Sequence, residues 1–141
     1  MIIPIPDSAP AARARCLRLH ATLPATIGSP KRRPTKPESD LTAAWGDPPI
    51  RLLCGVPRPS GLGGGAVAPI GVNGVAWLQG DHPSTFSPSG DDGDKEVTFT
   101  VVDRGVFVEV DIPKHYTGQS GILIDLSNAV RRALQAQPIP R

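Results

Sequence analysis

The two cysteines, Cys16 and Cys54, are the first residues whose type could support chemistry. The chain has no Cys-x-x-Cys motif, and His20, His82 and His115 are too far apart in sequence for a metal-ligand spacing. No metal site is therefore expected. A reactive thiol needs an activating environment, which no neighbouring pattern indicates. Two alternatives remain for the pair, a disulfide or two buried thiols.

Glu109 and Asp111 are the candidates for acid–base chemistry. They lie two residues apart in an alternating segment, so their carboxylates would be neighbours on one strand face. Paired carboxylates, together with a histidine, are what hydrolysis of a glycan would need. The competing and favoured interpretation is a strand that exposes its polar face. No Gly-x-Ser-x-Gly motif frames a nucleophile, so the sequence predicts no catalytic residue and no cofactor.

A basic cluster, Lys31, Arg32, Arg33 and Lys36, lies in a proline-containing stretch that is expected to be a loop over residues 27–49. Such a cluster could contact anionic lipid headgroups or an anionic cell-wall polymer. The alternative is a solvated loop that contributes only to solubility.

Composition limits the function classes. The 141 residues suit one domain, and Gly 15 with Pro 17 indicates long irregular connections around a small aliphatic core. Residues 1–58 carry nine Lys/Arg and four Asp/Glu (+5), and residues 59–141 carry six and nine (−3). No dense basic stripe with interleaved aromatics is present, which argues against nucleic-acid binding. No apolar run is long enough to span a bilayer.

The periodicity of apolar residues predicts an α+β fold with the order α-β-β-β-β-α. Helices are expected at residues 8–23 and 122–137, a turn of helix at 41–45, and strands at 50–56, 75–78, 97–101 and 106–112, with 70–72 as an added edge strand. Asn73-Gly74 and residues 103–105 are expected hairpin loops. The strands should form an antiparallel sheet of about four strands with both helices on one face. Residues 1–141 form one domain, with an extended segment 1–7 and a frayed tail 138–141.

This arrangement favours the disulfide over two free thiols. Cys16 falls on the apolar stripe of the first helix with Ala12, Leu19 and Leu23, and Cys54 falls on the apolar face of the 50–56 strand. If the helix packs on the sheet, both sulfurs enter the same interface. One helix-to-strand disulfide is therefore predicted.

The chain resembles a family of actinobacterial membrane-tethered proteins, filed as domain of unknown function 3515. The likeness rests on Trp-Gly-Asp-Pro-Pro at 45–49, Cys-Gly-Val-Pro-Arg-Pro at 54–59, the helix ending Leu23-Pro24, and the stretches 74–77 and 98–110. It implies a disulfide and an extracytoplasmic domain held to the cell membrane by an N-terminal segment, with no established activity. This chain begins at Met1 without that segment, so we expect the tether to have been removed, with a freestanding relative as the alternative.

These features together predict a non-enzymatic binding or accessory module for an envelope protein or polymer. Trp45, Asp47, Arg51 and Arg58 are the candidate partner contacts, because their proline-rich surroundings are rigid; for Trp45 a purely bracing role competes. The alternative is an enzyme acting on envelope glycan or lipid through Glu109, Asp111 and a histidine.

Overall fold

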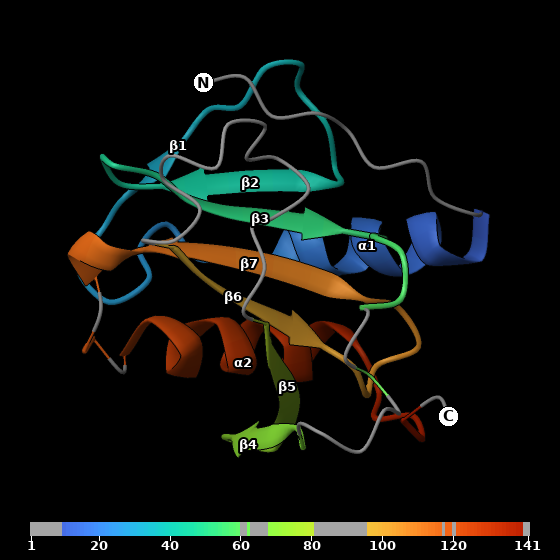
Figure 1. Ribbon diagram of the computed structural model, residues 1–141. Coiled ribbons are helices and arrows are strands. Elements are labelled where there is room, and N and C mark those ends of the chain that lie inside the picture. Colours follow the sequence, from blue (N-terminus) through green and yellow to red (C-terminus); the bar gives the residue numbers. More distant parts are fainter. Residues whose placement is uncertain are drawn as a thin grey trace.

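A seven-stranded antiparallel sheet forms the centre of the molecule, in the order β1-β2-β3-β7-β6-β5-β4 (Figure 1). The computed structural model describes residues 10–59, 62, 68–80, 96–116, 118–119 and 121–139. The strands are β1 (Arg32–Arg33), β2 (Thr42–Trp45), β3 (Ile50–Cys54), β4 (Ile70–Val72), β5 (Val75–Gly80), β6 (Glu96–Val101) and β7 (Val108–Pro113). The α+β class is confirmed, but the sheet is larger than the four strands expected.

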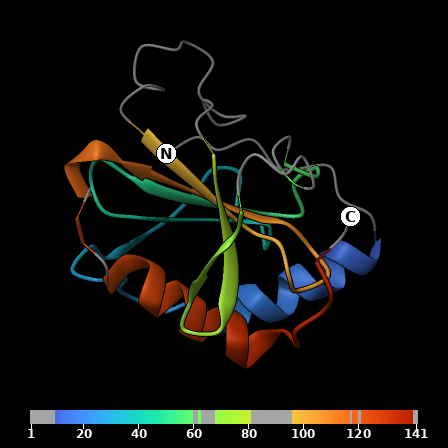
Figure 2. The ribbon, with the colours of Figure 1, turned by 60° about the horizontal axis from the view of Figure 1, so that its bottom comes forward.

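Two helices, α1 (Pro10–Thr22) and α2 (Gly121–Ala133), cover one face of the sheet (Figure 2). Their buried residues include Cys16, Leu19, Ile122 and Leu126, which share one core with inward-facing residues of β2, β3, β5, β6 and β7. Burial of these apolar stripes stabilises the fold by about 25 cal/mol per Å² removed from water. Both predicted stripes are confirmed, while α2 ends at Ala133 rather than at residue 137.

The stretch 27–49 differs from its prediction because it contributes two strands. Instead of a turn of helix, Thr42–Trp45 forms β2, which pairs with β3 from Thr42↔Leu53 to Trp45↔Ile50. All four β2 residues are buried. A strand covered on both faces has no alternating pattern, so periodicity cannot distinguish it from a helical turn. β1 then adds to the outside of β2 and forms one sheet edge.

β3 is shorter than predicted because Gly55 interrupts it. Gly55 has a φ of +89°, a backbone conformation that glycine adopts readily. The amides of Gly55 and Val56 both donate to the Phe107 carbonyl, at 2.9 and 3.3 Å. Two residues therefore oppose one, and Val56 packs with Ala44 and Leu53 rather than with the main core.

The hairpin between β4 and β5 is confirmed. Asn73 and Gly74 both have positive φ, 51° and 86°, as a two-residue turn of this type requires. The predicted 103–105 loop is wrong in length, because β6 and β7 last pair at Val101↔Val108. Arg104 is buried in that longer connection and donates to the Gly74 carbonyl at 3.0 Å, which joins the two turns.

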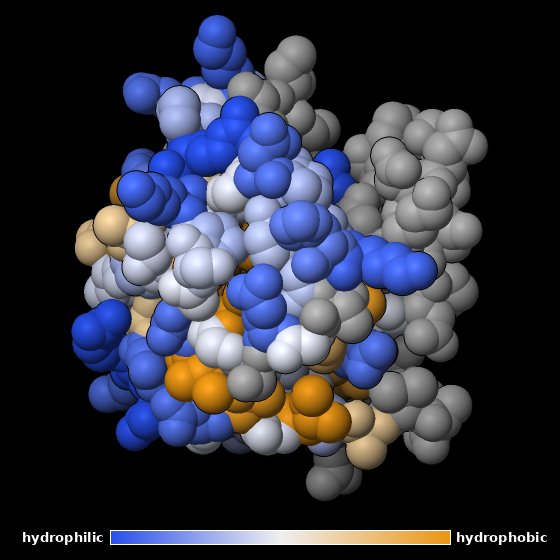
Figure 3. Space-filling model, turned by 90° about the vertical axis from the view of Figure 1, so that its left-hand side faces the viewer, coloured by the Kyte–Doolittle hydropathy of each residue, from blue (hydrophilic) through white to orange (hydrophobic). Residues whose placement is uncertain are grey.

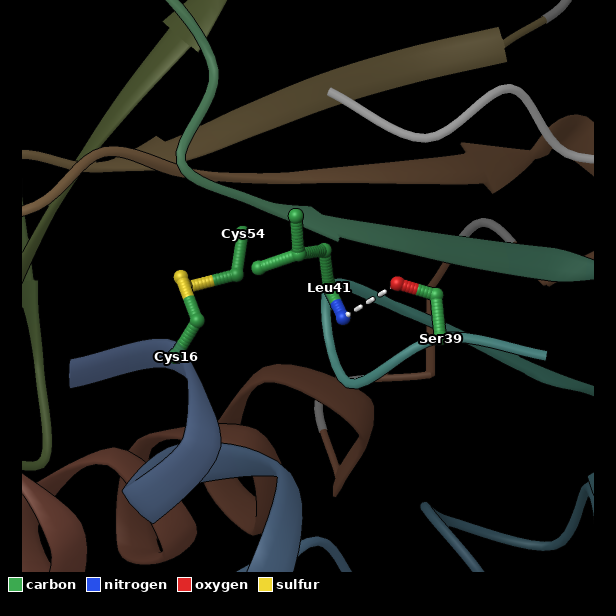
Figure 4. Close-up of a disulfide and its surroundings, with 4 residues drawn as sticks. All are labelled: Cys16, Ser39, Leu41 and Cys54. Carbon is green, nitrogen blue, oxygen red and sulfur yellow. Dashed lines mark hydrogen bonds between the residues drawn. A yellow bond between two sulfur atoms is a disulfide. The ribbon is translucent and has the colours of Figure 1, made fainter. Parts of the chain in front are cut away.

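The predicted disulfide is confirmed. Cys16 of α1 and Cys54 of β3 are bonded, with Cα atoms 5.7 Å apart and a sequence separation of 38 residues (Figure 4). The Cys54 amide donates to the Leu41 carbonyl at 2.8 Å, and the Leu41 amide donates to Ser39 Oγ at 3.0 Å. The disulfide therefore fixes α1 beside the segment that enters β2.

The extended segment expected at 1–7 lies outside the described residues. In the predicted tail, Pro138 and Ile139 are exposed and in no helix or strand. Gln137 donates its amide to the Asp103 carbonyl at 2.8 Å. The chain after α2 therefore packs along the β6–β7 connection as far as that residue.

Candidate binding cleft

A polar cleft of about 710 Å³ lies at the β1 edge of the sheet, beside the end of α1. Its lining consists of His20, Arg32, Arg33, Pro34, Thr35, Glu38, Ser39, Asp40, Thr42 and Ala43. The volume falls within the range of about 300–1,000 Å³ that is usual for ligand sites. The cleft contains two members of the predicted basic cluster, Arg32 and Arg33, whereas Lys31 and Lys36 are exposed and do not line it.

Arg32 is a partly buried residue of the cleft lining. Its guanidinium lies 5.5 Å from the centre of the Trp45 ring, a cation–π arrangement, because β1 places Arg32 opposite Trp45. Its Nη2 donates to His20 Nε2 at 3.1 Å. Partial burial lowers the pKa of Arg32 from its ordinary value, but a guanidinium stays charged at neutral pH. Arg32 is thus a fixed and partly desolvated cation.

His20 lies between Arg32 and Asp40. Because arginine can only donate, His20 Nε2 must accept, and the ring proton therefore resides on Nδ1, 3.6 Å from Asp40 Oδ1. Burial and the nearby Arg32 charge lower the pKa of His20 below 6.5, while Asp40 and a hydrogen bond with the Thr42 backbone raise it. The lowering prevails, so His20 is neutral at pH 7.

Arg33 lies beside the turn that follows β2. Its Nη1 donates to the Gly46 carbonyl at 3.0 Å and lies 3.9 Å from Asp47 Oδ1. Both charged side chains are substantially exposed, so this pair contributes little to stability. Arg33 therefore remains accessible to an anion that enters the cleft.

Thr35 and Thr42 line the cleft, and their hydroxyls are hydrogen-bonded to each other. Their oxygens are 3.2 Å apart and both residues are buried. In this hydrogen bond one hydroxyl donates and the other accepts, so the two buried groups are paired without a charged partner. The buried pair joins the β1–β2 connection to β2 and gives the cleft a fixed side.

The predicted partner contacts do not form one surface. Trp45 has 0% of its surface exposed, and its Nε1 donates to the Pro24 carbonyl at 3.1 Å, which is the bracing role. Asp47 does not line the cleft, but its Oδ1 lies 3.9 Å from Nη1 of the lining residue Arg33. Arg51 projects to the sheet face opposite the helices, and Arg58, beyond the far end of β3, donates to the Leu62 carbonyl at 3.2 Å.

A family model described as a protein of unknown function (DUF3515) matches residues 2–139. The chain belongs to this family. The DUF3515 match contains both bridged cysteines and every residue of the cleft. No curated protein and no solved structure matches the chain significantly. In the described part of this DUF3515 domain, neither helix is long and apolar enough to cross a membrane.

The prediction that Glu109 and Asp111 lie on an exposed face is wrong. They are 8% and 0% exposed, on the sheet face that the helices do not cover. Asp111 Oδ1 accepts a hydrogen bond from Thr98 Oγ1 at 3.0 Å, across the β6–β7 pair. Alternation along β7 did place both carboxylates on one face, but it cannot show whether other parts of the chain cover that face.

The histidines of this DUF3515 domain are placed separately. His20 faces the cleft, His115 is exposed with its ring 4.9 Å from and edge-on to Tyr116, and His82 lies outside the described residues. Among the described residues, no group of three or more His, Cys, Asp or Glu side chains is arranged to hold a metal ion.

Sequence reasoning missed the part of the cleft that depends on tertiary contacts. His20 was assigned no role, and Asp40 and Thr42 were placed in a loop and a helical turn. No short-range pattern links His20 to Arg32, because His20 lies on α1 and Arg32 on β1, and only the tertiary fold brings their side chains together.

Proposed function

We propose that this domain is a non-enzymatic, extracytoplasmic binding module for a component of the cell envelope. Its partner is an envelope protein or polymer that presents anionic groups to the cleft. The observation that carries the proposal is the pair of arginines in the cleft lining: Arg32 is partly buried over Trp45, and Arg33 follows it on β1. Two planar guanidinium groups suit carboxylate or phosphate oxygens.

The charges of the cleft favour an anionic polymer over a small neutral ligand. Arg32 and Arg33 are permanent cations, His20 is neutral at pH 7, and Lys31 and Lys36 are exposed on either side of β1. Glu38 and Asp40 also line the cleft and would disfavour an anion that occupied all of it. We therefore expect one anionic group to bind on the arginine side while the polymer continues past the exposed lysines.

The extracytoplasmic location is supported by the disulfide, since structural disulfides are rare in the cytosol. The actinobacterial origin and the N-terminal membrane tether are part of the proposal. Location can be tested by lysing cells that express the natural protein in denaturant with an alkylating reagent and without reductant, because both cysteines are buried in the folded domain. Cys16 and Cys54 should remain unmodified; alkylation of both thiols would contradict the location.

Binding is tested by titrating the folded chain with polyphosphate, poly-glutamate and neutral dextran, measured by isothermal titration calorimetry. The variant pair Arg32→Gln/Arg33→Gln should weaken binding of the polyanions at least about tenfold, because charge-assisted hydrogen bonds contribute about 1.5–3 kcal/mol each. Dextran should not bind. Added salt should weaken binding of the unmodified chain, since it screens exposed charges.

The matched control is Arg131→Gln/Arg132→Gln. These two adjacent arginines are exposed in the last turn of α2, outside the cleft, so the double substitution removes the same charge. Equal losses in both double variants would show that net charge alone attracts the polymer and would refute the cleft. In-cell crosslinking of the natural protein, followed by mass spectrometry, then identifies the envelope partner.

A further inference from the structure

A second cavity, of about 320 Å³, lies between α2 and the strands β5, β6 and β7. Its lining is Gln79, Val97, Phe99, Ile112, Tyr116, Gly118, Gln119 and Leu123. Apolar side chains dominate this lining, and none of the lining residues carries a formal charge at pH 7. An apolar cavity with a few amide groups is typical of a small-molecule site.

The size of the cavity restricts its occupant. Its volume corresponds to roughly ten water molecules at about 30 Å³ each. That is the lower end of the usual range for ligand sites and is too small for a lipid with two chains. Water gains few hydrogen bonds among Phe99, Ile112 and Leu123, so an apolar chain that displaced it would be favoured.

The charges around the cavity indicate the polarity of the other end of the ligand. Lys114 and His115 are exposed and directly precede Tyr116, which lines the cavity. Gln119 lies just before α2, and the first turn of α2 contains no acidic residue. The positive end of the helix dipole therefore adjoins the cavity without a compensating carboxylate in that turn. The charge of Lys114 and the start of α2 favour an anionic head.

The surrounding surface is also apolar. Figure 3 shows hydrophobic residues gathered low on the side of the molecule where α2 begins, at the height of α2 and β4. Ile124, next to the lining residue Leu123, is 40% exposed, and Ile70 of β4 is 45% exposed. Exposed apolar residues thus occur on the same helix as the lining residue Leu123 and on the neighbouring strand β4.

We propose that this cavity binds a single-chain anionic amphiphile, with its chain among Phe99, Ile112 and Leu123 and its head near Lys114. The site is separate from the polar cleft, which lies at the β1 edge of the sheet, so it does not depend on the proposed function. A module with both sites would recognise an amphiphilic and an anionic component independently.

The test measures binding of dodecanoate to the folded chain below its micelle concentration, by isothermal titration calorimetry. Dodecyltrimethylammonium provides a cation with the same chain. We expect the anion to bind at least tenfold more tightly than the cation. Leu123→Trp, which fills the cavity, should weaken the binding of dodecanoate at least tenfold. Val97→Phe fills the cavity from β6 and replaces Leu123→Trp in the test if that variant fails to fold.

Leu17→Trp is the matched control. Leu17 is 52% exposed on α1 and does not line the cavity, so this variant should bind dodecanoate within twofold of the unmodified chain. Lys114→Gln should reduce the preference for the anion severalfold. The proposal is overturned if dodecanoate does not bind in the millimolar range. Equal binding by the folded cavity-filling variant, or equal affinity for the cation, would overturn it as well.

Discussion

Opening the Cys16–Cys54 bridge should strongly destabilise this domain. The bridge closes a loop with a sequence separation of 38 residues. In the chain-entropy account, removing a cross-link of this length costs about 4 kcal/mol, because the unfolded chain regains its freedom. With an unfolding entropy of about 2.1 cal/mol/K per residue, the melting temperature of the 141-residue chain should fall by about 13 °C.

The stabilisation that comes from the covalent bond must be distinguished from that of sulfur packing, because both cysteines are buried in the main core. Reduction of the native protein keeps both sulfurs in place and removes only the bond. Cys16→Ala/Cys54→Ala removes the bond and the sulfur packing together. If the cross-link dominates, the reduced protein and the double variant should therefore have similar free energies of unfolding.

The assay is equilibrium unfolding in urea, followed by circular dichroism, for the oxidised protein, the reduced protein and the double variant. Intact mass after alkylation verifies the state of the thiols in each sample. A reduced protein whose free energy of unfolding lies within about 1 kcal/mol of the oxidised value would refute the loop-entropy reasoning. A large loss in the double variant alone would assign the effect to packing.

Two further predictions concern the cleft and the turn after β2. His20 has a lower pKa in the folded state than the 6.5 of the unfolded chain, so the unfolded chain binds more protons between those values. The free energy of unfolding should therefore decrease as pH falls from 7 through the folded-state pKa of His20. Chemical unfolding at several pH values should show a smaller decrease for His20→Gln. Equal decreases in the unmodified chain and the variant would contradict this prediction. Gly46→Ala should cost at least about 2 kcal/mol, because Gly46 has a φ of +77° and an added Cβ would collide with Tyr116 Oη. Gly71→Ala, whose Cβ would meet nothing within 4 Å, is the control and should shift the urea midpoint only slightly; equal shifts would refute the steric argument.

The sequence predicted those elements whose burial repeats with a clear period. Four such features depend only on residues close together in sequence and were predicted: the apolar stripes of α1 and α2, the Asn73-Gly74 turn, and the alternation of β7. The same reasoning extended to the disulfide, since Cys16 and Cys54 lie on the apolar sides of two elements that had to pack together.

The wrong predictions concern segments whose burial in the folded protein differs from the burial that their local sequence pattern indicates. Thr42–Trp45 is covered on both faces, so its strand has no period of two. Gly55 shifted Val56 to the other side of the sheet through its positive φ. Glu109 and Asp111 alternate as an exposed strand face would, yet both are buried. The period of a segment does not show which of its faces the rest of the fold covers.

By itself, the sequence determined the fold class, the disulfide and the position of the basic cluster, because periodicity and composition are local properties. Only the tertiary structure decided which of those cations act together. It placed Arg32 over Trp45 and against His20, left Lys31 exposed, and formed an apolar cavity beside α2. The physical reason is that strand pairing, and not sequence proximity, sets the distances between side chains that make up a site.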